Sequence, residues 1–292
     1  MPEPGTVAEV PLHAGSPYEL RVDLGHKISE VDVRTALRTG DMGFLHSFTT
    51  GSTVDGPGVR VVAWTSGCMW RCLYCHNPDT WTMSNGIPVP VARAIEELRK
   101  YQHGLKVMSG GFTLSGGEPL MQHRFAVKLL TAAHQMGVHT ALDTSGLLGA
   151  NLTDSMLADT DLVLLDVKSG DPDTYRRVTG GALAPTLEFG RRLARAGLAG
   201  GHAPEVWVRF VLVPGLTDDA DNVERVAAYV AELDEIRPGA VTRVEVLPFH
   251  QMGRYKWAAL GRTYQLEATR PPSAELTERV RDQFRAHGLV TY

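Results

Sequence analysis

The chain has few cysteines, no long apolar run and no excess of positive charge. Only three of its 292 residues are cysteines, too few for the multiple disulfides that hold small secreted domains together. No stretch approaches the roughly 18 to 20 apolar residues that span a bilayer, and the first residues carry Glu3 and Glu9 without the apolar segment of a secretory signal. The formal net charge of −4 argues against a polybasic surface for nucleic acid or anionic lipid. We therefore expect a cytoplasmic protein with no membrane or nucleic-acid partner.

The three cysteines lie within eight residues, in the run CMWRCLYCHN that begins at Cys68. Three thiols cannot all pair with one another as disulfides, but Cys68, Cys72 and Cys75 can all bind one cubane iron–sulfur cluster. Such a cluster normally takes four thiolates, so one iron would stay open to water, a partner or a substrate. A structural zinc site would need a fourth ligand, and the nearby candidate, His76, directly follows Cys75. A redox Cys-x-x-Cys pair would leave Cys68 without a role. The spacing favours the cluster and leaves both alternatives open.

Short apolar runs alternate with amphipathic stretches from residue 59 onward. Such alternation predicts an α/β fold with a parallel sheet of βαβ units, and the six units are two short of a closed eight-stranded barrel. Residues 1–40 are interpreted as an N-terminal extension of unknown role, with a short helix at 30–38, and residues 41–292 as one domain. Strands are predicted at 59–65, 112–115, 139–143, 162–167, 206–213 and 244–248, and helices at 90–101, 120–136, 186–199, 219–233 and 274–287.

Residues suited to chemistry lie at or near the ends of the six predicted strands. Active sites of parallel barrels lie at the carboxyl ends of the strands, so we expect these residues to meet at one mouth. After the cysteine loop they are Gly116, Gly117 and Glu118, then Asp143 and Thr144, then Asp166 and Lys168, then Arg209, and last His250.

Each of these residues also has a structural explanation. The pair Gly116-Gly117 would let a ligand approach the backbone, although two glycines also form ordinary turns. Glu118 could line the pocket or act as an acid favoured at a helix N-terminus. Asp166 and Lys168 could form a structural salt bridge instead of contacting a ligand.

Asp143 and Arg209 raise the same question of burial. An unpaired carboxylate at the end of a buried strand is costly, so Asp143 needs a cation or a bound metal ion. The Arg209 fork suits carboxylate or peptide recognition, and a buried structural ion pair is the competing account.

The motifs in this order resemble those of the radical SAM superfamily, named for S-adenosylmethionine, and within it the glycyl-radical-enzyme activases of the pyruvate formate-lyase type. Gly116 follows Cys75 by 41 positions with no cysteine between them, which leaves no room for the ferredoxin-like insertion of some relatives. The matching segments are HSF at 46–48, GSTVDGPGVR at 51–60, the cysteine loop with DTW at 79–81, TLSGGEPL at 113–120, DTSG at 143–146, DLVLLDVK at 161–168, VWVRFVLVPG at 206–215, LPFH at 247–250 and GRYKW at 253–257.

The resemblance implies a partial (β/α)6 TIM-type barrel, the radical SAM core, with one [4Fe-4S] cluster on Cys68, Cys72 and Cys75 and an open iron that binds S-adenosylmethionine. It also implies roles for further residues. Gly116, Gly117 and Glu118 would hold the methionyl amine, and Lys168 its carboxylate. Asp143 and Val167 would contact the cofactor, Asp166 would lie at its ribose, and Tyr74, His76 and His250 would lie at the adenine. A monovalent cation would bind at Asp143, Thr144 and Asp166, and Lys168 and Arg209 would join the cysteines as catalytic residues.

The implied reaction is reductive cleavage of S-adenosylmethionine to a 5′-deoxyadenosyl radical, which removes a hydrogen atom from a glycine of a partner such as pyruvate formate-lyase. Flavodoxin or ferredoxin would donate the electron. A radical enzyme acting on a small molecule, on the same scaffold, is the first alternative. A non-catalytic iron–sulfur sensor or redox module is the second, and it would not need the converging Gly116, Asp143, Asp166, Lys168 and Arg209.

Overall fold

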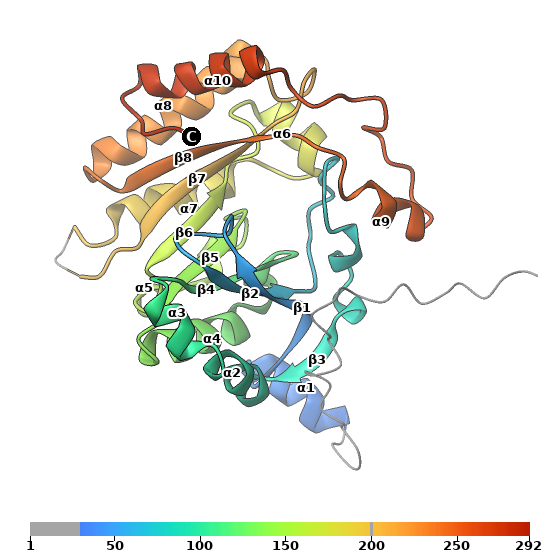
Figure 1. Cartoon of the computed structure of the whole chain (residues 1–292), viewed down its shortest axis with the longest axis vertical. Helices are drawn as coiled ribbons and strands as arrows, with labels where there is room; N and C mark the ends of the chain where they lie inside the picture. Colours follow the sequence, from blue (N-terminus) through green and yellow to red (C-terminus); the bar gives the residue numbers. More distant parts are fainter. Residues whose placement is uncertain (1–29, 199–200) are drawn as a thin grey trace, which may run out of the picture.

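The fold is a single curved sheet with helices on its outer side (Figure 1). The computed structural model describes residues 30–198 and 201–292. Eight strands pair in the order β3-β1-β2-β4-β5-β6-β7-β8, so β3 and β8 are the end strands and the barrel is not closed. Strands β2 and β4 to β8 are parallel to one another. This confirms the partial barrel of six parallel strands.

The predicted parallel strands are found within one to three residues of their expected bounds. β4 and β6 are buried along almost their whole length, the pattern that marks a parallel strand covered on both faces. The strands are β1 Met42–Ser52, β2 Arg60–Thr65, β3 Ile87–Pro90, β4 Gly111–Gly116, β5 His139–Thr144, β6 Leu162–Asp166, β7 Glu205–Leu212 and β8 Val241–Pro248.

The helices follow the strands in the expected alternation. The helix predicted at 186–199 corresponds to α7, which ends at Arg195, and residue 199 lies outside the described residues. No helix in the described part of the chain is long and apolar enough to cross a membrane. The helices are α1 Glu30–Thr39, α2 Val91–Arg99, α3 Gln102–Val107, α4 His123–Gln135, α5 Asp154–Leu157, α6 Pro172–Thr179, α7 Ala184–Arg195, α8 Ala220–Ile236, α9 Arg254–Ala259 and α10 Ala274–Ala286.

Two strands were not predicted. β1 pairs antiparallel with β2, and β3 pairs antiparallel with β1, so both extend the sheet beyond its parallel part. β3 contains two prolines, Pro88 and Pro90, which sheets tolerate at their edges because proline has no N–H to donate. The short helix expected before residue 40 is α1, which contacts β1 and α4.

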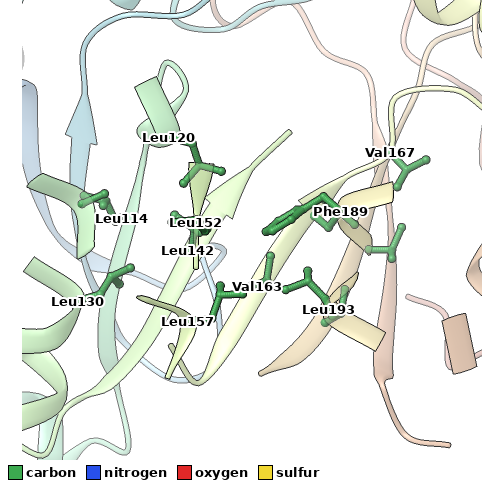
Figure 2. Close-up of a cluster of buried hydrophobic side chains, with 14 of the residues drawn as sticks. Leu114, Leu120, Leu130, Leu142, Leu152, Leu157, Val163, Val167, Phe189 and Leu193 are labelled. Atoms are coloured by element: carbon green, nitrogen blue, oxygen red, sulfur yellow. The ribbon is translucent and has the colours of Figure 1, made fainter. Parts of the chain in front are cut away.

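The main core lies between the outer face of the sheet and the helices. Alternate strand residues supply it, among them Leu114 from β4, Leu142 from β5 and Val163 from β6, and α7 adds Phe189 and Leu193 (Figure 2). All five are 3% exposed or less, and each such side chain stabilises the fold by about 1.5–3 kcal/mol. The core therefore fixes the strands from outside and leaves their inner face for other residues.

Candidate active site

The inner face of the sheet changes from apolar to charged along the strands. Near their starts, Ala141, Leu162 and Leu164 pack with Trp207 into a separate apolar cluster. Side chains two positions apart share one face of a strand, so the next inward positions are Asp143, Asp166 and Arg209. The apolar layer thus forms a floor, and the charged residues lie above it at the carboxyl ends of the strands.

The cysteine loop follows β2 and is held by backbone hydrogen bonds from several sides. The Cys68 amide donates to the Trp81 carbonyl at 3.1 Å, and the Leu73 amide to Val178 at 2.9 Å. The Trp257 indole donates to the Cys75 carbonyl at 2.9 Å. These contacts tie the loop to η2 (Pro78–Thr80), α6 and α9, so its course does not depend on the cysteines alone.

A cavity of about 620 Å³ opens at this end of the barrel, within the 300–1,000 Å³ range of small-molecule sites. It brings together nearly all the residues singled out from the sequence. Those lining it are Cys68, Cys72, Tyr74, Cys75, His76, Gly116, Gly117, Asp143, Thr144, Asp166, Lys168, Arg209 and His250. Glu118 and Val167 do not line it, and the cofactor-binding roles of all these residues remain predictions.

The lining fits a cubane cluster with an organic ligand beside it. Three thiols supply the soft donors that an iron–sulfur cluster takes, and the buried Tyr74 hydroxyl has no hydrogen-bond partner among the described residues. A buried polar atom without a partner is costly, and a ligand in the cavity would supply one. Among the described residues, no group of three or more Cys, His, Asp or Glu side chains could hold a single metal ion.

Burial keeps the three thiols protonated in the free protein. Desolvation raises the pKa of Cys68 and of Cys72, and raises that of Cys75 to about 12. Metal ligation requires thiolates and therefore releases protons. The site has low polarity, which disfavours free thiolates. The same low polarity favours thiolates whose charge is neutralised by bound iron.

Gly116 and Gly117 allow two backbone segments to meet beside the cysteine loop. Gly116 has φ of +126°, and a Cβ there would lie 2.1 Å from the Thr65 nitrogen. A Cβ on Gly117 would lie 2.4 Å from the Gly67 oxygen. The pair therefore packs β4 against the start of the loop, and this places its backbone at the wall of the cavity.

Glu118 is a buried carboxylate that links the turn after β4 to the end of β5. It is 1% exposed, and its carboxylate accepts hydrogen bonds from the Thr144 hydroxyl at 2.6 Å and from the Ser145 amide at 3.0 Å. Burial raises the pKa of Glu118, and these hydrogen bonds partly offset the rise. The monovalent-cation site at Asp143, Thr144 and Asp166 remains a prediction.

Arg209 is the centre of a buried ion network. Its guanidinium lies 3.0 Å from the Glu245 carboxylate, 3.6 Å from Asp143 and 3.9 Å from Asp55. Burial alone would lower the pKa of Arg209, but Asp143 and Glu245 outweigh it and raise the pKa. Burial raises the pKa of Asp143 to about 7, against the effect of Arg209. The cost of burying Asp143 is thus met partly by Arg209 and partly by the Ser115 hydroxyl, which donates to it at 2.6 Å.

Lys168 and Asp166 form an ion pair at the cavity wall, with 2.8 Å between Nζ and Oδ2. Burial favours neutral Lys168, but Asp166 outweighs it and the pKa is raised well above its ordinary value. The same ammonium lies 5.7 Å from the centre of the Tyr74 ring. The salt bridge predicted as the structural explanation therefore exists, and it holds a permanent positive charge in the cavity.

The two histidines expected on the adenine side come together from distant segments. The rings of His76 and His250 lie 4.2 Å apart between centroids. A Cβ on Gly253 would lie 2.6 Å from the His76 Cα, so the segment after β8 packs closely on the cysteine loop. Burial, followed by the neighbouring His250, lowers the pKa of His76, which favours a neutral ring suited to stacking.

Sequence reasoning missed Asp55 and Glu245. Asp55 lies in the Gly- and Pro-rich loop before β2, a segment that was used for the resemblance but not for the site. Glu245 is opposite Arg209 in the register of β7 and β8. An acid alternating with valines in VEVLP, on the face that Arg209 occupies in the next strand, was the signal that could have identified it.

A parallel, unclosed barrel that gathers three cysteines, a Gly-Gly-Glu turn and strand-end charges around one cavity defines the radical SAM class. The family model of the Radical SAM superfamily matches residues 62–227, more than half of the chain. Solved structures agree in fold. A radical SAM methyltransferase from Sphaerobacter thermophilus superposes with a TM-score of 0.56 at 15% identity, over 91% of this chain and 81% of that chain.

Relatives with higher sequence identity indicate which family within this superfamily the chain belongs to. The pyruvate formate-lyase 1-activating enzyme of Escherichia coli is 37% identical over 249 residues, 85% of this chain and 97% of the relative. The pyruvate formate-lyase-activating enzyme of Staphylococcus aureus is 41% identical over 241 residues, 80% and 91% of the two chains. A domain of such an enzyme from Bacteroides vulgatus has a TM-score of 0.50 at 25% identity, over 63% and 98% of the two chains. The chain therefore belongs to the family of pyruvate formate-lyase-activating enzymes.

Proposed function

We propose that this protein activates a pyruvate formate-lyase-type enzyme by removing a hydrogen atom from one of its glycines. The supporting observation is the convergence of the three cysteines, the Asp166–Lys168 pair and Arg209 on one cavity. The relatives named for this activity cover 80–85% of the chain. A small-molecule substrate is the weaker alternative, because it gains nothing from that similarity.

The residues divide the work among binding, orientation and exclusion of water. Cys68, Cys72 and Cys75 would hold a [4Fe-4S] cluster. The cavity-lining residues at the ends of β4, β5 and β6 would hold S-adenosylmethionine. When bound, these groups supply a 5′-deoxyadenosyl radical able to take a hydrogen atom from glycine, using one electron from flavodoxin or ferredoxin. The hard chemistry belongs to the cofactor, and the protein contributes binding and orientation.

Charge in the cavity sets the orientation of the ligand. The Lys168 ammonium, held by Asp166, would attract the methionyl carboxylate, and His76 with His250 would flank the adenine. Arg209 is fixed by Asp143 and Glu245 and reaches Asp55 in the loop before β2. Its fork is suited to a carbonyl or carboxylate of an incoming peptide. No general base is needed, because hydrogen leaves as an atom.

We also propose that residues 41–292 form the catalytic domain and that residues 1–40 are an appended segment. Residues 1–29 lie outside the described residues. A reducing cytoplasm is the compartment that suits the three free cysteines, and we propose it as the location of the protein.

The test is anoxic reconstitution with iron and sulfide, reduction with dithionite, addition of S-adenosylmethionine, and quantification of 5′-deoxyadenosine. The wild type should produce it and the Cys72→Ala variant should not. A bound cluster without cleavage would favour the sensor or redox alternative. Zinc in place of iron would contradict the cluster itself.

A further inference from the structure

The cysteine loop has an outward side whose residues have no part in the cavity. Cys68, Trp70 and Cys72 line the cavity, whereas Met69 and Arg71 do not. Met69 is 57% exposed, an unusual position for a large apolar side chain between two cluster ligands. The alternation along the loop therefore gives it one face for the cofactor and one for solvent.

Two arginines gather on this outward side. The guanidinium of Arg71 lies 4.9 Å from the centre of the Trp81 ring, and that of Arg262 lies 5.1 Å from it. Both residues are exposed, and neither forms an ion pair with any residue that the structure describes. Two exposed positive charges thus border one aromatic ring, and a negatively charged partner would supply the counter-charge that the described residues do not.

This surface is directly connected to the cluster ligands. Arg71 donates to the Cys68 carbonyl at 2.8 Å, and the Trp81 carbonyl accepts from the Cys68 amide at 3.1 Å. Trp81 also lines the cavity, so it borders both the two arginines and the space where the cluster would bind. A partner on this side would be one residue away from a cluster ligand without covering the cavity.

We propose that Met69, Arg71 and Arg262, with the Trp81 ring beneath them, form the docking surface for an acidic one-electron carrier, a flavodoxin or ferredoxin. This inference rests on the proposed function, which requires such a donor. On docking, the reduced carrier would pass one electron to the cluster held by Cys68, Cys72 and Cys75, so that the carrier is oxidised and the cluster is reduced by one electron. An exposed apolar centre with arginines around it is the composition typical of protein interfaces, and the charge would steer an acidic carrier to it.

A second basic groove offers a matched control. It has a volume of about 500 Å³ and is lined by Arg38, Arg124, Met83 and Met121, among others. The two methionines pack against Gly67, so this groove also borders the start of the cysteine loop. Arg124 is exposed and forms no ion pair with the described residues, which makes Arg124→Glu the same charge change at a rival site.

The experiment measures binding of a purified bacterial flavodoxin and a bacterial ferredoxin to the cluster-loaded protein by calorimetry at low and high salt. We expect Arg262→Glu and Met69→Glu each to weaken binding of one carrier about tenfold, which is about 1.4 kcal/mol, and Arg262→Glu also to reduce its salt dependence. Arg124→Glu should bind like the wild type. Iron content of every variant checks that the cluster is intact.

Dithionite separates this inference from the proposed function. Because it delivers electrons without docking, dithionite-driven 5′-deoxyadenosine production should be unchanged in Arg262→Glu. Weaker binding in Arg124→Glu than in Arg262→Glu would overturn the proposal, as would equal binding by all variants or no binding of either carrier by the wild type. Absence of 5′-deoxyadenosine from the wild type with dithionite would instead refute the proposed function.

Discussion

The two faces of the same strands follow different rules. On the outer face, β6 presents Val163 and Leu165 to the helices, both fully buried in the main core. On the inner face, it presents Leu164 and then Asp166, at the floor and the wall of the cavity. The outer face needs only apolar side chains of suitable volume. The inner face near the carboxyl ends needs particular charges, and each of them has a charged partner, from another strand for Asp143 and Arg209 and from the same segment for Asp166.

This difference separates stability from function. A substitution on the outer face should change the free energy of unfolding and leave the chemistry intact. A substitution on the inner face near the strand ends should change mainly the chemistry and the pH dependence of stability. The cysteine loop repeats the contrast on a smaller scale, because Cys72 faces inward and Met69 faces solvent.

The largest expected effect comes from Cys72→Ala. Mutation of the residues that hydrogen-bond to metal ligands typically lowers metal affinity about 10- to 100-fold. Loss of a ligand itself should therefore lower cluster binding by more than about a hundredfold. Iron, sulfide and visible absorbance after anoxic reconstitution measure it. Met69→Ala, three positions away, should keep the cluster. Equal iron in the two variants would break the distinction between the two sides of the loop.

On the outer face, Leu165→Ala should destabilise the protein by about 2–5 kcal/mol. Leu165 is 0% exposed and packs near Gly146 and Gly190, so the truncation leaves a cavity that the sheet cannot readily fill. Urea unfolding of the cluster-free protein gives the value. Below its unfolding transition the variant should still bind iron fully, and iron loss without loss of stability would contradict the assignment of this face to folding alone.

The charged layer should make stability fall as pH rises. Burial raises the pKa of Asp143 from 3.8 to about 7 in the folded protein. Between these values the folded state binds more protons than the unfolded state, so the free energy of unfolding decreases with pH, by at most about 1.4 kcal/mol per pKa unit. Urea midpoints of the cluster-free protein at pH 5 and pH 8 should show this decrease, and Asp143→Asn should reduce it. An equal pH dependence in both proteins would show that Asp143 titrates normally.

The smallest effect is expected between the outer helices α7 and α8, and its dependence on pH has the opposite sign. Arg191 on α7 donates to Glu232 on α8 at 2.6 Å, and this lowers the pKa of Glu232. The resulting stability is present above the ordinary pKa and is lost as pH falls through the lower folded value. Because the pair is partly exposed, Glu232→Gln should cost less than about 0.5 kcal/mol. Urea midpoints at pH 7 and pH 3 test it, and a larger loss at pH 3 would contradict the sign.

The parallel part of the fold could be predicted because its signals are local. Each of β4 to β8 contains a short apolar or alternating run, and helical stretches separate them. β1 was missed because His46 and Ser47 are buried within it, so its sequence shows neither an apolar run nor a regular alternation. β3 was missed because its two prolines are compatible with a strand only at an edge, and the sequence does not reveal which strand is an edge.

The gathering of the candidate residues around one cavity could be predicted where a residue lies at the end of a parallel strand. Asp143, Asp166 and Lys168 are of this kind. The roles of Asp55 and Glu245 depend on Arg209, which contacts both from another strand, so they follow only from the register of β7 and β8 and the path of the loop before β2. The pairing of His76 with His250 likewise depends on tertiary packing between distant segments.

The most direct test of the account is electron paramagnetic resonance on purified pyruvate formate-lyase after anoxic incubation with the reduced, cluster-loaded protein and S-adenosylmethionine. The account predicts a glycyl radical on the lyase, formed together with 5′-deoxyadenosine and absent when the Cys72→Ala variant replaces the wild type. Formation of 5′-deoxyadenosine with no radical on the lyase would contradict it and favour a small-molecule substrate.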